Sequence, residues 1–469
     1  MKTKHHLIYL FLPLLLVNAC KVGKDYQRPA TGLPARFNAT AYADTSSIAD
    51  ISWKQFFADT TLQRLIGLGI AHNYDLQIAL KNIDASAEQL KRSKLLLLPE
   101  VNLQVTGQYN RPSDNSLNGL SASGFLGSHH IEDYNANLGL SWELDIWGKI
   151  RRQKEVVLAQ YLQTYEATKA VQTQVVANIA QAYYNLRMLD KQLAIARENL
   201  QLNDTTTRLT QLLKNAGEAN LLAVQQAQAQ QQATALLIPQ LEQSIAIQEN
   251  NLQVLTGQLP GEIKRIKGQP IVFAESSSPG LPAAILSRRP DVRATEMALK
   301  AANAQVGAAQ GNMYPSFTIS ASGGVESLKS STWFNIPASL FGIANGSLLQ
   351  PLFNQRELKT RYETAKIQRD QAALSFRQSV LSAVGEVSNA LVQADKLKEQ
   401  RKIADNRTNT LHQAVRNAQL LFKSDMANYL EVITAQGNAL QAELDLATIE
   451  RQQAGANVEL YRALGGGWK

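Results

Sequence analysis

The sequence predicts a mainly α-helical protein that also contributes strands to a membrane β-barrel and is built from a tandem-duplicated unit. Three observations predict this fold: a motif that occurs twice, alternation of apolar residues after each copy, and very long helical runs with coiled-coil spacing. Each member of the second motif lies 216 residues after its counterpart in the first. The two copies are Asp75, Pro99 and Gly107, and Asp291, Pro315 and Gly323. A chain of 469 residues is also long enough for two units.

The N-terminus predicts a lipoprotein signal peptide over residues 1–19. Two lysines precede an apolar run from Leu7 to Val17, which is shorter than the roughly 20 residues that span a bilayer. Cys20 is the only cysteine in the chain and follows Ala19. Its place resembles that of the cysteine that bacterial lipoprotein signals present for acylation; the alternative is a chance cysteine in an ordinary signal. Residues 20–50 then predict an extended, lipidated tether.

Charge and motifs exclude several classes of function. Removal of residues 1–19 takes away two lysines and lowers the formal charge from +8 to 45 − 39 = +6. This excess is spread along helices, so we predict no nucleic-acid partner. The chain has no GxSxG, P-loop or HExxH motif and no paired cysteines, so we predict no enzyme, no cofactor and no metal site. The pair His129 and His130 lies in a loop rich in Ser and Gly, where a solvated surface pair is the simpler interpretation.

The first repeat is predicted over residues 51–257. Its helical character ends at Pro99, which cannot continue a helix. Apolar and polar residues then alternate at about 100–110 and 134–147. Strands of this length with aromatic residues near their ends favour a membrane barrel, and an amphipathic sheet on a soluble core is the alternative. The residues predicted to form an interfacial aromatic belt are Tyr109, Tyr134, Trp142 and Trp147.

The second repeat is predicted over residues 283–469, after a linker at 258–282 that is rich in proline and glycine. Its strands are predicted at about 316–326 and 340–353. The first of these alternates clearly between apolar and polar residues. The second alternates poorly, so the sequence leaves open which of its residues face which side.

A very long helix follows each predicted hairpin. Apolar residues step along both helices by three and four, which is typical of coiled-coil seams. The two long helices end in matching turns, since residues 219–228 align with 427–436 at an offset of 208 and six of the ten positions are identical. Each turn then leads into a returning helix, so each repeat contains a long helical arm.

Four strands per chain cannot close a barrel, because the smallest membrane barrels have about eight. An open sheet in lipid would leave unpaired backbone groups that cost several kcal/mol each. Membrane-spanning strands therefore require several chains to combine, and three chains would supply about 12 strands. The amphipathic helices would then continue the tube outside the membrane.

Four segments carry a resemblance to a known family: residues 22–29 (VGKDYQRP), 288–293 (RRPDVR), 350–354 (QPLFN) and 460–468 (LYRALGGGW). In this order they resemble the TolC/OprM-type outer-membrane factors of tripartite RND efflux systems, in the lipoprotein, NodT-like branch. The resemblance implies a homotrimer in the bacterial outer membrane, with a 12-stranded barrel and a 12-helix periplasmic tunnel. It also implies a periplasmic adaptor protein, an inner-membrane RND-type transporter and, through acylation, outer-membrane lipid as partners.

The resemblance also implies a periplasmic gate at the two helical tips. The corresponding residues are Gly217, Asn220, Asp425, Asn428, Tyr429, Glu431 and Thr434. The family's acidic positions fall on Glu431 and on Thr434, which replaces an aspartate, while Asp425 stands where a turn glycine is common. Three Glu431 carboxylates around one axis would repel each other and raise the local negative potential. The alternative is that Glu431 is an ordinary solvated helix residue.

These observations predict a passive exit duct: a trimeric channel-tunnel that conducts small molecules from the periplasm or the transporter to the exterior and is opened at its tip by an adaptor. Two alternatives remain from the sequence. One is the exit duct of a type I secretion system, and the other is a non-conducting periplasmic coiled-coil lipoprotein that acts as a scaffold. The alternating strands favour a duct, because a scaffold does not need them.

Overall fold

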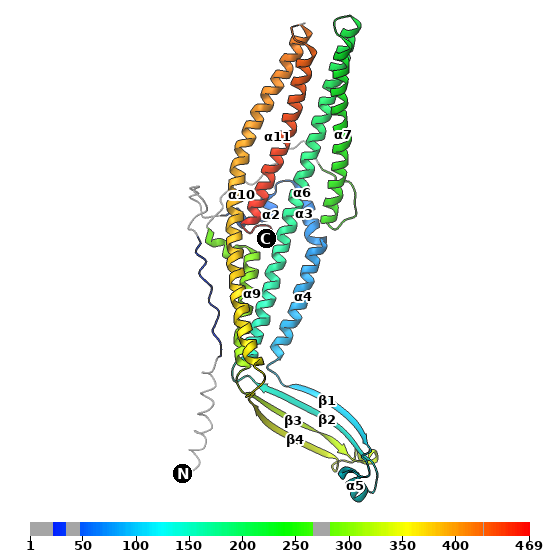
Figure 1. The fold of residues 1–469 in the computed structure, drawn as a ribbon, viewed down its shortest axis with the longest axis vertical. Coiled ribbons are helices and arrows are strands. Elements are labelled where there is room, and N and C mark those ends of the chain that lie inside the picture. The colour runs from blue at the N-terminus through cyan, green and yellow to red at the C-terminus, as the bar shows by residue number, and fades with distance from the viewer. Residues whose placement is uncertain (1–21, 34–46, 266–281, 425) are drawn as a thin grey trace. The chain divides into compact units, whose positions relative to one another are not determined.

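The computed structural model describes residues 22–33, 47–265, 282–424 and 426–469 (Figure 1). The predicted signal peptide at 1–19, the predicted acylation site Cys20 and the predicted tip residue Asp425 therefore lie outside the described residues. The chain divides into two compact units. One unit, here called the sheet unit, contains Ala85–Leu162 and Met297–Leu374 together with the N-terminal segment up to Pro29. The other, the helical unit, contains Ala30–Asp84, Gln163–Glu296 and Ser375–Lys469. Each unit takes segments from both repeats, so the compact units cut across the duplication.

The duplication is visible in three pairs of helices of equal length. These are α4 (Tyr74–Leu95) with α9 (Pro290–Gly311), of 22 residues each; α6 (Lys149–Asn215) with α10 (Glu357–Lys423), of 67 each; and α7 (Leu221–Leu255) with α11 (Tyr429–Ala463), of 35 each. The offset is 216 for the first pair and 208 for the other two, so the second hairpin with its connection to α10 is 216 − 208 = 8 residues shorter than the first.

The remaining described helices are short. Two of them, α2 (Trp53–Phe56) and α3 (Thr60–His72), belong to the helical unit. The other short helices and helical turns are η1 (Ile48–Asp50), α5 (Leu117–Ser121), η2 (Ala122–Leu126), η3 (Pro282–Ala284), α8 (Ile285–Arg288) and η4 (Ser330–Thr332). Across the described parts of the chain, no helix combines the length and the hydropathy that crossing a bilayer requires.

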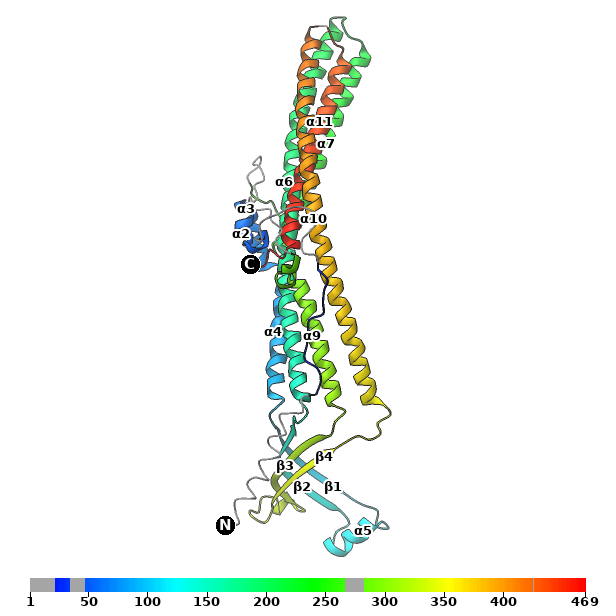
Figure 2. The same ribbon diagram turned by 90° about the vertical axis from the view of Figure 1, so that its left-hand side faces the viewer.

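The sheet unit contains one antiparallel sheet in the order β1-β2-β3-β4, which curves and twists along its strands (Figure 2). The strands are β1 (Glu100–Asn110), β2 (Ile131–Leu144), β3 (Ser316–Ser327) and β4 (Leu340–Leu349). Leu138 of β2 lies opposite Leu103 of β1 and Gly323 of β3. Because side chains alternate between the faces of a sheet, this register gathers the predicted apolar residues on one face and the Asn, Gln and Ser residues on the other.

The register also assigns the two faces of β4, which the sequence left open. Ala344 lies opposite Ala321, which places the even-numbered residues of β4 on the apolar face of the sheet. The odd-numbered residues Phe341, Ile343 and Asn345 share the other face and line a shallow hollow there with the polar residues of β1, β2 and β3. The weak alternation of β4 thus arises because three large apolar residues, Phe341, Ile343 and Leu349, stand on the otherwise polar face.

Two strands end earlier than the sequence predicts. The predicted strand at 134–147 is β2, which begins and ends three residues earlier, so Trp147 lies after the strand. Strand β2 stops because the Asp145 carboxylate caps α6: its oxygens accept hydrogen bonds from the backbone N–H groups of Ile150 at 2.8 Å and Arg151 at 2.9 Å. The predicted strand at 340–353 is β4, which ends at Leu349, because Pro351 has no N–H to donate to a ladder.

The core of the helical unit forms where α3 packs on the middle of α6. Leu62, Leu65 and Ile66 of α3 and Ile179 and Leu186 of α6 are fully buried. This packing confirms the seam predicted from the steps of three and four along α6. Burying such a side chain contributes about 1.5–3 kcal/mol.

A polar contact orients the same two helices. The Asp59 carboxylate, which caps α3, accepts hydrogen bonds from the Tyr183 hydroxyl at 2.7 Å and from the Arg187 guanidinium at 3.0 Å. Burial, together with the hydrogen bond to Asp59, raises the pKa of Tyr183 to about 12. The hydroxyl therefore stays protonated and remains a donor at any physiological pH.

Candidate functional site

The first helical tip is the turn between α6 and α7. The N–H of Glu218 donates to the carbonyl of Leu213 at 2.9 Å, which closes the last turn of α6. Gly217 makes this closure possible because its φ of +86° is a left-handed conformation that other residues seldom adopt. The Asn220 side chain then caps α7 by accepting a hydrogen bond from the N–H of Ala223 at 2.9 Å. Gly217 and Asn220 thus hold the backbone of this turn.

The second tip, between α10 and α11, repeats this closure with an additional carboxylate. The N–H of Met426 donates to the carbonyl of Leu421 at 2.9 Å, as Glu218 does in the first tip. Asn428 caps α11 by accepting from the N–H groups of Leu430 at 2.9 Å and Glu431 at 3.2 Å. In return, the Glu431 carboxylate accepts from the N–H of Asn428 at 3.1 Å. The two residues form a capping box, a role signalled by their spacing of three residues and missed in the sequence reasoning.

A side-chain hydrogen bond joins the two tips of the chain. The Tyr429 hydroxyl donates to the Gln226 side-chain carbonyl at 2.7 Å, which connects α11 to α7. Thr434 is exposed on the next turn of α11. Its counterpart in the first repeat, at 434 − 208 = 226, is the glutamine that Tyr429 contacts. The structure therefore brings Asn428, Tyr429 and Glu431 together with Gln226, a partner that the sequence reasoning did not name.

A line of buried polar contacts lies behind the tips in the helical unit. The side chain of Gln436 on α11 donates to Thr206 on α6 at 3.0 Å, and Asn203 on α6 donates to Thr234 on α7 at 2.8 Å. All four side chains are almost completely buried. In the sequence, the signal that could have predicted these contacts is the presence of polar residues at the three- and four-residue spacing of a helical seam. Buried polar contacts fix the register of packed helices, because shifting them would leave unsatisfied groups.

A three-helix contact follows in the same unit. The Glu443 carboxylate on α11 accepts from the Asn199 side chain on α6 at 2.8 Å and lies 2.5 Å from the His412 ring on α10. This carboxylate therefore links both long helices to one returning helix.

The aromatic residues predicted as a belt lie at the two ends of the sheet. At the end near α6, the Trp142 indole donates to the carbonyl of Leu97 at 3.0 Å, and the Trp147 indole donates to that of Pro315 at 2.7 Å. At the other end, the rings of Tyr109 and His130 stack at 4.9 Å, and Tyr134 lies 5.4 Å from Trp333. His130 is thus held by an aromatic ring.

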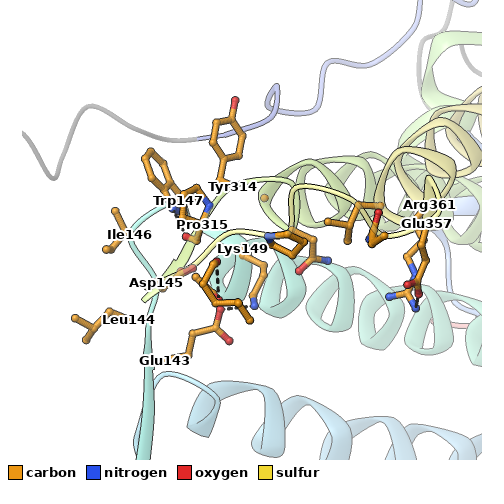
Figure 3. Close-up of a pocket in the computed structure, with 17 residues that line it drawn as sticks. Glu143, Leu144, Asp145, Ile146, Trp147, Lys149, Tyr314, Pro315, Glu357 and Arg361 are labelled. Carbon is orange, nitrogen blue, oxygen red and sulfur yellow. Dashed lines mark hydrogen bonds and ion pairs between the residues drawn. The ribbon is translucent and has the colours of Figure 1, made fainter. Parts of the chain in front are cut away.

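A cavity of about 420 Å³ lies at the end of the sheet nearest α6, within the sheet unit (Figure 3). Trp147 stacks on Tyr314 at one side, with 5.1 Å between the ring centroids. Lys149 points toward Glu143 and forms an ion pair with it, while Glu357 pairs with Arg361. The lining thus carries both charges and aromatic rings, and its cations are already paired with carboxylates.

The N-terminal segment is held against the sheet unit by Arg152 of α6. The guanidinium, 4% exposed, donates to the carbonyls of Val22 at 3.3 Å and Gly23 at 3.0 Å and pairs with Asp25 at 3.0 Å. A Cβ on Gly23 would lie 2.7 Å from the Cα of Gly307, so only glycine allows this close approach. The VGKDYQRP motif at 22–29 is therefore a docked segment, and Arg152 is its receptor.

The RRPDVR motif at 288–293 acts as a structural clamp. The buried Arg289 guanidinium pairs with Asp291 at 2.5 Å and Glu386 at 2.9 Å, and donates to the carbonyl of Ala463 at 3.0 Å. Burial alone would raise the pKa of Asp291, but the hydrogen bond and charge of Arg289 outweigh it and hold that pKa below its usual value of 3.8. The motif thus ties α9 to α10 and to the end of α11.

The C-terminal LYRALGGGW motif also has a packing role. The Tyr461 ring stacks on Phe56 of α2 at 4.1 Å, and its hydroxyl donates to the carbonyl of Ile51 at 2.8 Å. A Cβ on Gly466 would lie 2.3 Å from the Tyr461 ring, so glycine is required there. Burial raises the pKa of Tyr461 to about 12.

The loop that holds His129 and His130 shows a simpler arrangement. The His129 ring contacts Asp114 at 3.0 Å, and the His130 ring contacts Ser128 at 2.9 Å. Within the residues that the structure describes, no group of three or more His, Cys, Asp and Glu side chains is arranged to hold a metal ion.

Comparison with known proteins places these features in a family. The family model described as "Outer membrane efflux protein" matches residues 65–258 and 281–466. The probable outer membrane lipoprotein SilC of Salmonella typhimurium is 29% identical, with 97% of each chain covered. The probable efflux pump outer membrane protein TtgC of Pseudomonas putida is 30% identical over 98% of this chain and 96% of its own.

The fold has a solved counterpart as well. The crystal structure of the open state of the MtrE outer membrane channel of Neisseria gonorrhoeae superposes with a TM-score of 0.86 at 25% identity. The superposition covers 96% of this chain and 99% of MtrE. Because the family model spans both repeats and the fold matches over nearly the whole chain, this chain belongs to the outer membrane efflux protein family.

Proposed function

We propose that the protein is the outer-membrane exit duct of a tripartite efflux pump, a passive trimeric channel-tunnel. The observation that carries this proposal is the sheet of the sheet unit, which has one apolar face and one polar face, and whose edge strands β1 and β4 pair with no further strand among the described residues. A membrane strand needs an apolar face toward lipid and a polar face toward water. A soluble scaffold would have no use for an apolar face on which Leu103, Leu138 and Leu348 are more than half exposed.

Closure of the barrel follows from the unpaired edges. Unpaired backbone groups in lipid cost several kcal/mol each, so edge strands there must pair. Pairing of β4 of one chain with β1 of the next, repeated three times, gives a closed barrel of about 12 strands. The four aromatic residues at the two ends of the sheet would form its interfacial belts.

The two helical tips are the proposed gate. Tyr429 holds the second tip to the first through Gln226, while the Asn220 cap of the first tip, the capping box of the second and the two turns keep each tip closed on itself. Several large apolar side chains stand exposed around the tips and offer a docking surface for an adaptor: Leu212, Leu221, Leu222, Leu420, Met426 and Leu430. In this arrangement Glu431 completes the helix cap of each chain. The three copies of Glu431 in a trimer also place three negative charges around the axis.

The partners and the location follow from the same family membership. We propose a periplasmic adaptor and an inner-membrane RND-type transporter as partners, and Cys20 as the acylated residue. The names of the relatives support this, since SilC is described as an outer membrane lipoprotein and TtgC as part of an efflux pump. Because the duct is passive, the selection of cargo resides in the transporter.

The test is single-channel conductance of the purified trimer in planar bilayers. Tyr429→Phe removes only the hydroxyl that contacts Gln226, a hydrogen bond worth about 0.5–1.5 kcal/mol, so we expect the open probability to rise roughly two- to tenfold. Tyr74→Phe, at an exposed tyrosine on α4, is the matched control and should leave conductance unchanged. If intact trimers of wild type and both variants never conduct, the protein is a scaffold and the duct is wrong.

A further inference from the structure

Two exposed apolar segments flank the free edges of the sheet at the end where the helices begin. Before β1, a run of four leucines occupies positions 95–98, of which Leu95 and Leu98 are 59% and 60% exposed. After β4, Leu352 and Phe353 are 94% and 89% exposed. Leu95 ends α4, Leu96 to Leu98 belong to the connection α4–β1, and Leu352 and Phe353 belong to the connection β4–α10, so each segment adjoins an edge strand.

The large, exposed apolar side chains of these two segments indicate an interaction site. Scattered apolar residues are normal on a protein surface, but contiguous ones mark an interaction site. Here the apolar side chains continue the strands whose own N–H and C=O groups are unpaired, and such an edge is completed by another strand. A second copy of this chain can cover the side chains and pair the edge at the same time.

The direction of the strands decides which segments meet. In the order β1-β2-β3-β4 each neighbour is antiparallel, so β1 and β4 also run in opposite directions. When β4 of one chain pairs with β1 of the next, the end of β4 at Leu349 lies beside the start of β1 at Glu100. The segment that follows Leu349 then lies beside the segment that precedes Glu100.

The backbone after Phe353 is held in an unusual shape. Gln355 and Arg356 both have positive φ, 54° and 67°, although neither is glycine. A left-handed conformation costs about 1–2 kcal/mol for each such residue, and it persists where the surroundings over-determine it. This turn carries the chain from β4 into α10 with Leu352 and Phe353 directed away from their own chain, which suits a contact made with another copy.

We propose that Leu352 and Phe353 of one chain pack on Leu95, Leu96 and Leu98 of the next, forming an apolar lock at each subunit boundary where barrel and helices join. The lock rests on the trimer of the proposed function. It assigns the residues that hold neighbouring subunits together where the barrel meets the helices. Lipid is the competing occupant. The exposed cations Lys91, Arg92 and Lys94 lie within four residues before the leucines, and the exposed Arg356 lies three residues after Phe353. These charges favour a protein contact at an aqueous boundary.

Engineered cysteine pairs test the lock directly, because Cys20 is the only native cysteine and acylation consumes its thiol. The full-length lipoprotein carries Leu98→Cys with Phe353→Cys, or Leu96→Cys with Leu352→Cys, and is oxidised in membranes. We expect at least one pair to give covalent dimers and trimers on denaturing gels that disappear on reduction. Each single-cysteine variant should stay monomeric on such gels, since the lock joins two different segments.

A matched control places one cysteine at the wrong end of the sheet. Leu117→Cys with Phe353→Cys uses a leucine that is more exposed than Leu98 and lies near the opposite ends of the strands, roughly 30 Å away for a strand of this length. It should give no cross-link.

To test for lipid, bimane is attached at Phe353→Cys in vesicles that contain brominated phospholipid. Quenching in intact trimers would show that lipid covers this residue and would overturn the lock.

The lock and the duct fail in different ways. If the cysteine pairs never cross-link although sizing shows a trimer and the trimer conducts, the lock is wrong and the duct stands. If the wild-type chain does not form trimers at all, the proposed duct is wrong, and the lock, which depends on the trimer, is wrong with it. A cross-link between single cysteines at Leu352→Cys would also contradict the lock, because it would bring identical segments together.

Discussion

The two repeats of this chain share three pairs of helices of the same lengths and the same capping residue at their tips, yet three of the differences between them bear on their contacts. In the first repeat Arg152 holds the N-terminal segment; the equivalent residue of the second, at 152 + 208, is Thr360. In the first tip Ala223 is buried, whereas Glu431 at the same place of the second tip is exposed and completes a capping box. The segment between α9 and α10, which contains the second hairpin, is also eight residues shorter than the segment between α4 and α6.

The role of Arg152 and the contact between the tips both involve a feature that occurs only once in the chain. The N-terminal segment exists once, so one repeat needs a receptor for it. The contact between the tips needs a donor on one side and an acceptor on the other, and Tyr429 meets Gln226 where exact repetition would place a leucine or a threonine. Duplication therefore set the backbone, and pairwise contacts between the copies made their side chains diverge.

The largest expected effect concerns the sheet, to which both repeats contribute. Leu138→Arg in the first hairpin places a charge on the apolar face and should destabilise the assembled barrel by about 2–4 kcal/mol near mid-membrane. Ala344→Arg in the second hairpin should do the same, because the register places Ala344 on that face. Refolding into vesicles measures both. Asn137→Arg on the polar face is the control, and a loss as large as that of Leu138→Arg would contradict the assignment of faces.

The next effect tests the asymmetry between Arg152 and Thr360. Arg152→Gln removes charge-assisted hydrogen bonds worth about 1.5–3 kcal/mol, so the N-terminal segment should leave its site. Trypsin should then cut after Lys24 roughly ten times faster, as mass spectrometry of the fragments measures. Thr360→Gln, the same change of residue at the equivalent position, should leave cleavage at wild-type rates. Equal cleavage in both variants and wild type would mean that Arg152 is not the receptor.

A smaller effect separates the two tips. Asn428→Ala should destabilise the first turn of α11 by about 1–2 kcal/mol, because it removes two accepted hydrogen bonds, whereas Asn220→Ala removes one and should cost about 0.5–1 kcal/mol. Hydrogen exchange of the first-turn amides measures both changes. Glu431→Gln keeps a side chain that completes a capping box and should leave the exchange unchanged. Faster exchange in that variant would show that the charge itself matters.

The smallest effect depends on pH. Because Arg289 holds the pKa of Asp291 below 3.8, the ionised carboxylate stabilises the folded state above about pH 4, and this contribution is lost as pH falls through the lower folded-state pKa. Thermal unfolding should therefore separate wild type from Asp291→Asn at pH 7, and the gap between the two should shrink as the pH falls below 3.8. Asp75→Asn, at the equivalent aspartate of the first repeat, is the matched control. A gap that stays constant with pH would refute the linkage.

Much of the molecule was predictable because its signals are local. A proline ends a helix through its own ring, and alternation or a step of three and four reports which face of one element is apolar. The helix seam on α6, the hairpins and the duplication were predicted in this way. The ends of β2 were missed because Asp145 prefers to cap α6, and the capping role of Glu431 was missed although its spacing from Asn428 signalled it.

The sequence by itself thus determined the repeat, the long helices, the amphipathic strands and the family. Only the tertiary structure decided which face of β4 joins the apolar side, that Tyr429 meets Gln226, and that Arg152 holds residues near position 23. The contacts of Tyr429 and Arg152 join residues that lie far apart along the chain, whereas the register of β4 joins it to the neighbouring strand β3. Their partners are chosen by packing in space, which no local pattern of residues records.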